Sequence, residues 1–564
     1  MRTVFIHGET ERFEAARFEL ITLFTQHHPD QVSAELAMLL LRDKLAADGL
    51  LAHWTEADVV RFLAEVAPRR VVLSEDWSQV PRFAHRWLDF LAEEGLLAGD
   101  PLTALHEAVD AATPRYLAGM AEPTEWGAEK FWRTALLEHG VDESDEDAVA
   151  EFAAQVERGE VDVDEDLVDR LEEDSDDEAV WLPPVQLTGE GPHREIAADA
   201  PIVEQVAEVI RWAETDGDPS AADSLVEALG DTETADLLLE WCARAGLLRM
   251  SEERIVPTLI AAPVLAEPEL LWNRLWQRFV LVEDAFAEQL ADAEEDAVPE
   301  IVQTLLSALY AATEPVPEDF LVDFAADALE LDDTAGLASV VRTITAQWAA
   351  MDAVVVDDED ERLLEMRPAG RWAARESLRA FGFRVPTVAE LRTAPAELVA
   401  LLFAEAPPQT QQALCTQWIS HRGAKQAATD LAELLERVDE PPVRLAALAI
   451  LEYAGDEGIA AARGLVDDER CGATVRVWLG AATGESIARP GDELALTLDG
   501  MAATAEDDVE SFVEEFAGQP TEDQLKLIGE MAASAEPAAG ALLSALAELH
   551  PDQEVAEAAS AAMG

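Results

Sequence analysis

The stretch that decides the fold class lies toward the C-terminus and reads Val443-Arg444-Leu445-Ala446-Ala447-Leu448-Ala449-Ile450-Leu451. Its apolar residues recur at the helical spacing i, i+3, i+4 and i+7, which predicts a helix with one buried face. Similar short segments follow at 458–465 and 473–479, with Asp, Gly or Pro between them. We therefore expect residues 386–564 to form a HEAT-like α-solenoid of stacked helix pairs.

Helical periodicity also dominates the rest of the chain, whereas the alternating pattern of strands is rare and short. In the first region it predicts helices at Val32–Asp48, Thr55–Val66 and Pro81–Glu94. We expect a mainly all-α, multidomain protein that begins with an N-terminal helical domain at 1–140.

Two segments in the middle of the chain, 201–290 and 291–385, share one order of elements. Each contains three predicted helices followed by two short strands and a turn. This order resembles a winged helix, and its tandem occurrence strengthens the interpretation. The predicted helices are Val203–Thr215, Ser220–Leu229 and Thr232–Gly246 in module 1, and Glu300–Ala311, Glu318–Leu329 and Thr334–Met351 in module 2.

The charge of the chain limits its partners. Its 564 residues, enough for about four domains, include 116 acidic and 39 basic side chains, for a net charge of −77. A surface this acidic repels phosphate, so direct nucleic-acid binding and docking on anionic lipid are disfavoured, while a basic protein partner is favoured. Residues 142–178 hold 19 acidic and two basic side chains, and we expect an acidic spacer at 141–200.

The winged-helix-like modules carry charges of the wrong sign for DNA. Their third helix and wing must meet phosphates and therefore need Lys and Arg. The third helix of module 1 instead carries Asp231, Glu233, Asp236 and Glu240, and the wing of module 2 is Asp357-Asp358-Glu359-Asp360-Glu361. We expect these modules to act as packing or protein-binding units.

No catalytic, cofactor or metal signature occurs. The three cysteines, Cys242, Cys415 and Cys471, are far apart, which argues against a zinc site or a disulfide framework and fits a reducing cytoplasm. The segment Asp162–Glu173 has EF-hand-like carboxylates, but Leu167 replaces the glycine of the sharp turn. We expect no membrane span, no catalytic residue and no cofactor.

One basic patch stands out in this acidic chain. Arg69, Arg70, Arg82, His85 and Arg86 lie close in sequence, and Arg82 and Arg86 share a helix face at i, i+4. The patch is a candidate site for an anion or a partner. The alternative is pairing with neighbouring carboxylates.

Four stretches carry a resemblance to a known family: Phe62-Leu63-Ala64-Glu65-Val66-Ala67-Pro68-Arg69-Arg70-Val71, Ala121-Glu122-Pro123-Thr124-Glu125-Trp126-Gly127, Trp181-Leu182-Pro183-Pro184 and Met366-Arg367-Pro368-Ala369-Gly370-Arg371-Trp372. Their order is similar to that of uncharacterised, mostly helical actinobacterial proteins with winged-helix-like modules and a HEAT-like C-terminal region. That family has no assigned activity, so the resemblance implies architecture alone.

The sequence therefore predicts a non-enzymatic acidic scaffold or adaptor in the cytoplasm, which recognises a basic protein partner through its helical surfaces. Two alternatives stay open. One is a regulator of nucleic acid or of a DNA-binding protein, acting through DNA mimicry or the arginine patch. The other is an enzyme built on a helical scaffold. The oligomeric state is not predicted.

Overall fold

The structure is a computed structural model of the chain, and it is mostly helical, as the sequence predicts. Within the part it describes, no helix is both long enough and apolar enough to cross a membrane. The described residues are 2–6, 10–29, 31–72, 77–142, 145–158, 161, 180–187, 199–218, 223–230, 232–249, 254–279, 282, 297–329, 331, 334–357, 362–534 and 536–563.

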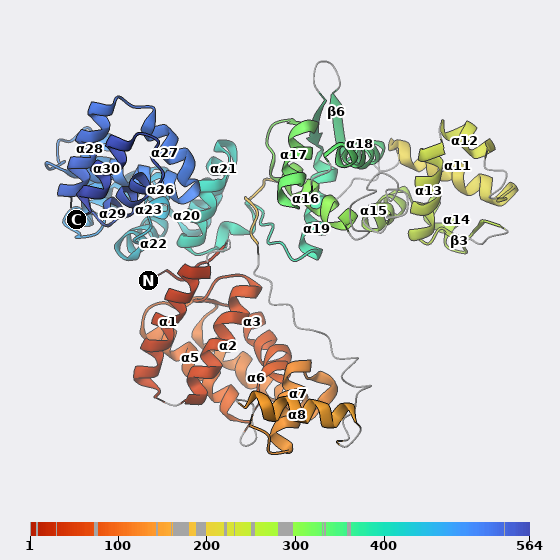
Figure 1. The fold of residues 1–564 in the computed structure, drawn as a ribbon, viewed down its shortest axis with the longest axis horizontal. Helices are drawn as coiled ribbons and strands as arrows, with labels where there is room; N and C mark the ends of the chain where they lie inside the picture. The colour runs from red at the N-terminus through yellow and green to blue at the C-terminus, as the bar shows by residue number, and fades with distance from the viewer. Residues whose placement is uncertain are drawn as a thin grey trace. The chain divides into compact units, whose positions relative to one another are not determined.

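The chain forms two compact units (Figure 1). Unit 1 joins the N-terminal residues Met1–Val180 to Arg392–Ala404 and Cys415–Gly564, and unit 2 contains Trp181–Leu391 and Glu405–Leu414. The first boundary falls between Val180 and Trp181, inside the predicted spacer. The grouping of the two ends of the chain in one unit has no counterpart in the sequence pattern.

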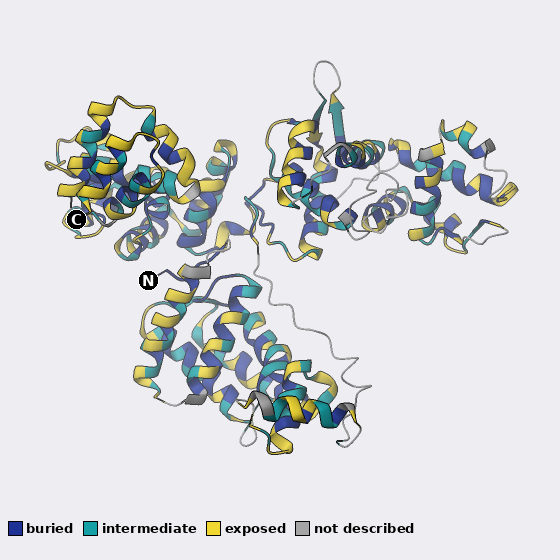
Figure 2. Ribbon diagram, in the orientation of Figure 1, coloured by how far each residue is buried: buried dark blue, intermediate teal, exposed yellow. Residues whose placement is uncertain are grey.

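The N-terminal part of unit 1 is a helical domain whose buried residues line the inner faces of its helices (Figure 2). Thr55 and Asp58 form a capping box at the start of α3. The predicted helix 55–66 is longer than expected, because α3 continues through a π-helical turn at Phe62–Val66 into α4. The elements are α1 (Thr10–His27), α2 (Gln31–Ala47), β1 (His53–Trp54), α3 (Glu56–Arg61), α4 (Ala67–Arg70), α5 (Gln79–Glu93), β2 (Ala98–Gly99), α6 (Leu102–Ala121), a 3₁₀ turn (Pro123–Glu125), α7 (Ala128–Glu138) and α8 (Glu146–Glu157).

Helix α8 belongs to this domain although its sequence lies in the predicted acidic spacer. Its Phe152 and Val156 are buried against Ala135 and Leu136 of α7. Apolar residues at helical spacing therefore outweigh the charge of this segment, because their burial removes apolar surface from water.

The C-terminal part of unit 1 is a succession of short helices without strands among its described residues. Three of these helices form a row in space, in which α23 packs on α26 and α26 packs on α29. The helices are α20 (Ala396–Glu405, of which Glu405 lies in unit 2), α22 (Ala424–Arg437), α23 (Pro441–Tyr453), α24 (Asp456–Gly464), α25 (Gly472–Thr483), α26 (Asp492–Asp507), α27 (Val509–Ala517), α28 (Thr521–Ala533), α29 (Pro537–Leu549) and α30 (Gln553–Ala562). The helix α21 (Pro408–Arg422) crosses from unit 2 into unit 1 at Cys415.

A buried carboxylate joins the two parts of unit 1. Glu397 of α20 accepts hydrogen bonds from the backbone N–H and the hydroxyl of Thr3, at 3.1 and 3.3 Å. It also pairs with Arg437 of α22 at 2.9 Å, although its side chain is only 2% exposed. A carboxylate this deeply buried needs such partners, because its desolvation is costly.

Unit 2 includes the two segments 201–290 and 291–385, to which the names module 1 and module 2 refer. Module 2 runs helix, strand, helix, helix, strand, strand, and its three strands form an antiparallel sheet in the order β5-β7-β6. In module 1, β3 and β4 form a two-stranded antiparallel pair. The elements are α11 (Pro201–Thr215), α12 (Asp223–Leu229), α13 (Thr232–Arg244), β3 (Leu248–Arg249), β4 (Val256–Pro257), α14 (Ala261–Leu265), α15 (Pro268–Phe279), α16 (Ala297–Ala311), β5 (Val316–Pro317), α17 (Glu318–Ala328), α18 (Thr334–Ala350), β6 (Val354–Asp357), β7 (Leu363–Met366), α19 (Pro368–Ala380) and a 3₁₀ turn (Leu391–Thr393, which ends in unit 1).

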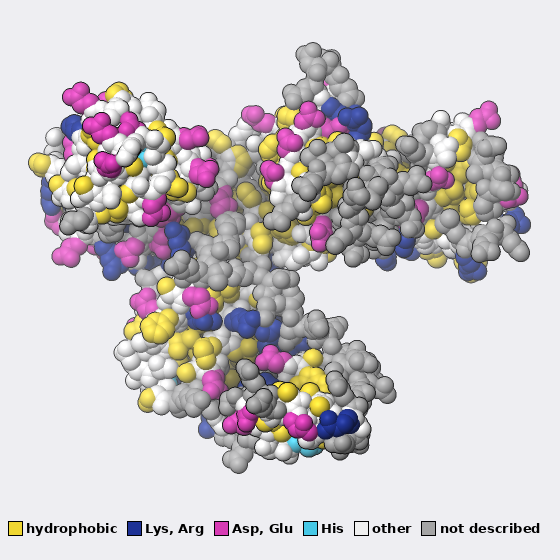
Figure 3. All heavy atoms as spheres, in the orientation of Figure 1, with side chains coloured by type: hydrophobic (Ala, Val, Ile, Leu, Met, Phe, Trp, Pro, Cys, Tyr) yellow, Lys and Arg dark blue, Asp and Glu magenta, His cyan; other side chains and the backbone are white. Residues whose placement is uncertain are grey.

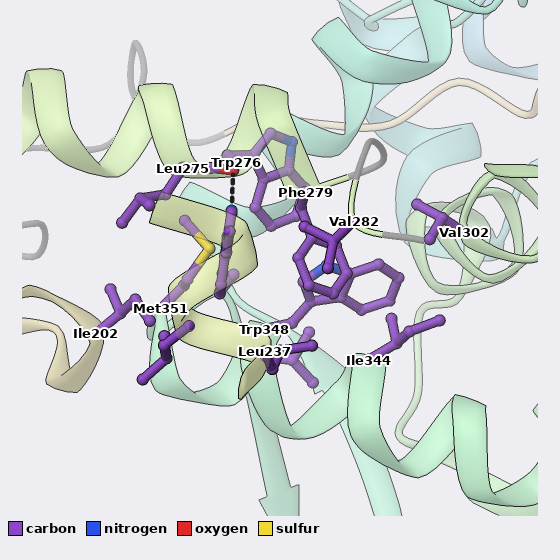
Figure 4. Close-up of a cluster of buried hydrophobic side chains, with 14 of the residues drawn as sticks. Ile202, Leu237, Leu275, Trp276, Phe279, Val282, Val302, Ile344, Trp348 and Met351 are labelled. Atoms are coloured by element: carbon purple, nitrogen blue, oxygen red, sulfur yellow. Dashed lines mark hydrogen bonds between the residues drawn. The ribbon is translucent and has the colours of Figure 1, made fainter. Parts of the chain in front are cut away.

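One hydrophobic core runs through both modules of unit 2, and tryptophans form its centre (Figure 4). Trp276 stacks on Trp272 and Trp348, with ring centroids 5.4 and 6.1 Å away. Two of the buried indole N–H groups donate to backbone carbonyls: that of Trp272 to Met351 at 2.7 Å, and that of Trp241 to Leu275 at 2.8 Å. The two modules are thus parts of one folded unit.

Gly370 at the start of α19 provides a test of this packing. A Cβ there would lie 2.2 Å from the Ala353 carbonyl oxygen, a backbone atom that cannot move aside easily. We expect Gly370→Ala to destabilise the protein by about 1–3 kcal/mol, measured by urea unfolding. Gly529→Ala is the matched control in α28, where the Cβ meets open space, and it should stabilise by about 1 kcal/mol. If the two substitutions changed the free energy of unfolding equally, position 370 would not lie close to the Ala353 carbonyl.

The ion pair between Arg476 and Asp492 provides a second test. The guanidinium donates two hydrogen bonds of 2.7 Å to a carboxylate that is 5% exposed. We expect Arg476→Met to cost about 3–5 kcal/mol at neutral pH, because it leaves a buried charge unpaired. The hydrogen bonds from Arg476 lower the pKa of Asp492, so the pair stabilises the fold above the ordinary carboxyl pKa and loses this effect as acid protonates Asp492.

The control for this pair is Arg463→Met. Arg463 pairs with Glu485 at 2.6 Å, and both side chains are about half exposed. Its loss should cost less than about 1 kcal/mol. Urea unfolding of both variants at neutral and acid pH measures the loss of unfolding free energy in each. A loss in Arg476→Met that is as large in acid as at neutral pH would contradict a stabilising ion pair between Arg476 and Asp492.

Candidate functional sites

The structure divides the predicted basic patch between two helices. Arg69 and Arg70 end α4, whereas Arg82, His85 and Arg86 lie on α5. The three α5 residues make contacts within the fold. Arg82 donates to the Ser78 hydroxyl at 2.9 Å, His85 contacts Asp110 at 3.2 Å, and Arg86 donates to the Ser33 hydroxyl at 3.0 Å.

Arg70 instead lines a pocket with arginines that the sequence does not single out. This basic pocket has a volume of about 340 Å³ and contains guanidinium groups from four different helices of unit 1. Its lining residues are Arg17, Glu35, Leu36, Met38, Leu39, Arg42, Arg70, Val71, Val72, Glu129 and Arg133. No sequence signal could have grouped the four arginines, because only tertiary packing brings α1, α2, α4 and α7 together.

A second pocket of unit 1, which we call the acid pocket, follows the row α23, α26 and α29. Its volume is about 410 Å³. Its walls are lined by five alanines, whose short side chains leave the space open: Ala502, Ala505, Ala538, Ala541 and Ala545. Its charged residues are Arg12, Asp439, Glu440, Arg444, Asp499, Glu506 and Glu536, which give a formal charge of −3.

The innermost charges of the acid pocket are paired. Arg444 donates to both oxygens of Asp499 at 2.7 and 2.8 Å, and both side chains are less than a tenth exposed. The hydroxyl of Thr474 donates to Asp499 at 2.9 Å. This pair links α23 to α26, so it forms the rigid floor of the pocket.

The outer carboxylates are less well compensated. Burial and the nearby Glu440 raise the pKa of Glu506 above its ordinary value, although Arg12 lies 3.2 Å away. Burial, followed by the charges of Asp499 and Asp492, raises the pKa of Glu536. A raised carboxyl pKa means that the ionised form is disfavoured at its site, so a positive charge in the pocket would relieve both residues.

Unit 2 contains an aromatic pocket of about 340 Å³. Trp276, Trp348 and Trp372 contribute to its wall. Two of the polar groups beside them are used within the fold, since the Ser377 hydroxyl accepts a hydrogen bond from Trp276 at 2.9 Å and Glu376 pairs with Arg375 and Arg379. The pocket is a predominantly apolar cavity next to the tryptophan core.

The described residues include all three cysteines, and none of them is exposed. Burial raises the pKa of each thiol to about 12. Among the residues that the structure describes, no group of three or more His, Cys, Asp or Glu side chains is placed to hold a metal ion. The EF-hand-like segment 162–173, the acidic turn 358–361 and most of the spacer 159–198 lie outside the described residues.

Comparison of the chain with protein-family models, with curated proteins and with solved structures gave no match. The resemblance to the actinobacterial family therefore remains a sequence-based expectation.

The buried thiols allow a direct test of nucleophilic cysteine chemistry. With a pKa of about 12, each thiol is almost entirely protonated at pH 8, and its burial excludes reagents. We expect no reaction with a thiol-specific disulfide reagent in the folded protein at pH 8, and three equivalents after unfolding in urea. Rapid modification of any one cysteine in the folded protein would identify it as reactive.

Proposed function

We propose that this protein is a non-enzymatic acidic scaffold or adaptor of the cytoplasm that binds a basic protein partner, and that the acid pocket receives a basic side chain of that partner. The observation that carries the proposal is that two carboxylates, Glu506 and Glu536, line the same pocket. Burial first, and neighbouring carboxylates second, raise the pKa of each above its ordinary value.

The shape of the acid pocket supports a side chain as its ligand. Its volume of about 410 Å³ lies in the range of pockets that enclose small ligands or single anchoring side chains. A guanidinium or ammonium group between Glu506 and Glu536 would accept no proton and donate several hydrogen bonds. The apolar stem of Arg or Lys would lie against Ala541 and Ala545, as such stems do on apolar surfaces.

The surrounding charge supports a basic partner as well. The chain has a net charge of −77, so its field attracts a basic protein and accelerates the encounter. The pocket then supplies the specific contact that a diffuse field lacks. The row of α23, α26 and α29 carries the pocket, and we propose that these helices form the recognition face of a HEAT-like C-terminal region.

For unit 2 we propose winged-helix-like modules that serve protein binding. The order helix, strand, helix, helix, strand, strand in module 2 supports this assignment. In module 1, Glu240 occupies the third helix and pairs with Arg244 at 3.4 Å. A carboxylate at this position disfavours a DNA phosphate, and it is compatible with a basic protein surface.

A binding experiment tests the acid pocket. The probe is a fluorescein-labelled hexa-arginine peptide, and its dissociation constant is measured by fluorescence anisotropy at 150 mM salt. We expect Glu506→Gln/Glu536→Gln to weaken binding by about tenfold, because it removes two charged acceptors. Binding should strengthen as pH rises through the raised pKa values of the two carboxylates, since only their ionised forms attract the peptide.

The matched control is Glu514→Gln/Glu522→Gln, which removes the same charge from exposed positions of α27 and α28. We expect its dissociation constant to stay within about twofold of that of the unmodified chain. The pocket variant should unfold at a urea concentration no lower than the unmodified chain, because burial disfavours the charged forms that it removes. Equal weakening in both variants would show diffuse attraction and overturn the assignment of binding to the acid pocket. If the unmodified chain did not bind the peptide, the proposal of a basic partner would be wrong.

A further inference from the structure

We infer that the basic pocket of unit 1 binds a small phosphate monoester, with the phosphate on its arginines and the organic part on its apolar floor. This site is separate from the acid pocket, and the inference does not depend on the proposed function. It rests on the charge, position and shape of the residues that line the cavity.

The charge of the basic pocket is opposite in sign to the net charge of the chain. Four arginines and two glutamates line it, so its formal charge is +2 in a protein with 116 acidic and 39 basic side chains. Figure 3 shows dark blue basic side chains beside yellow apolar ones on the visible face of the N-terminal helices. Even with Glu14, which contacts Arg17, the arginines outnumber the carboxylates here, so the pocket attracts an anion within a field that is otherwise repulsive.

The arginines come from separate elements that converge on one cavity. Arg17 lies on α1, Arg42 on α2, Arg70 at the end of α4 and Arg133 on α7. Two of them also meet carboxylates of their own helices: Arg17 contacts Glu14, and Arg133 lies 3.9 Å from Glu129. These intrahelical contacts orient the guanidinium groups of Arg17 and Arg133, and a guanidinium has five N–H donors with which it can bind more than one acceptor.

The helix α2 supplies the apolar part of the pocket through one face. Glu35, Met38, Leu39 and Arg42 are spaced at i, i+3, i+4 and i+7 and therefore lie on the same side of the helix. Met38 is 43% exposed although it is a large apolar residue. Val71 and Val72, directly after Arg70, complete the floor. A bare inorganic anion would leave this apolar surface in water, whereas an ester with an organic group would cover it.

Phosphate fits the arginines better than a carboxylate does. A phosphate monoester has about two negative charges near pH 7 and three acceptor oxygens, and guanidinium groups bind such oxygens in pairs. A small ligand is favoured over a polyanion because screening confines the attraction of the pocket to about 8 Å at physiological salt. A nucleic acid would extend beyond that distance onto acidic surface, where it is repelled.

The test uses phenyl phosphate, inorganic phosphate and a single-stranded oligonucleotide as probes, with binding measured by isothermal titration calorimetry at 150 mM salt. We expect phenyl phosphate to bind at least about tenfold more tightly than inorganic phosphate, because it also covers the apolar floor. The oligonucleotide should bind more weakly than phenyl phosphate. Equal affinity for the two phosphates would overturn the apolar contribution, and stronger binding of the oligonucleotide would overturn the assignment to a small ligand.

Substitutions locate the site. Arg42→Gln and Arg133→Gln should each weaken phenyl phosphate binding about tenfold, the effect of losing one charged hydrogen-bond donor. Arg115→Gln, at an exposed position of α6 outside the pocket, is the matched control and should change the affinity less than twofold. Circular dichroism melting checks that each variant is folded. No binding by the unmodified chain, or equal weakening in the control, would overturn the proposal.

Discussion

Buried ion pairs built on a small number of basic side chains hold the helices of this acidic protein in register. Lys44 is fully buried and pairs with Asp48 and Asp58 at 2.7 and 3.0 Å. Glu318, 4% exposed, pairs with Arg342 and Arg362. Pairs of this kind add little net stability, because desolvation offsets their attraction, yet breaking one of them is costly. Such pairs join elements that the hydrophobic cores bring together, as Lys44 of α2 does with Asp58 of α3.

The pairing of the few basic side chains explains why the acid pocket and the basic pocket of unit 1 have opposite charges. In the acid pocket, Arg444 pairs with Asp499 and Arg12 with Glu506, which leaves three more lining carboxylates than lining arginines. In the basic pocket, four arginines and two glutamates line one cavity. The net charge of the chain does not predict the sign of the charge in either pocket. The charge of each pocket results from the way in which packing distributes a limited set of arginines among the helices.

The sequence predicts the elements well and the sites poorly, for one physical reason. Periodicity is local, so the helix around residues 443–451 and the strands on either side of residues 358–361 follow from it. A pocket depends on side chains that are distant in sequence. Arg70 and Arg82 are close in the chain but lie on different helices, whereas Arg17 and Arg133 are far apart and line one cavity. Likewise, the contact of Thr3 with Glu397 has no local signature.

The raised pKa values of Glu506 and Glu536 connect structure to recognition through proton linkage. Two carboxylates that are disfavoured as anions make the folded protein bind protons more tightly than the unfolded chain does, so this site opposes folding as pH rises. A basic ligand reverses the balance, because it stabilises the ionised forms and displaces the bound protons. The energy that burial costs in the free protein is then recovered in the complex. On the proposed function, a charge pattern that is unfavourable for stability is thus favourable for binding a cation, and the contact of Arg12 with Glu506 compensates only part of it.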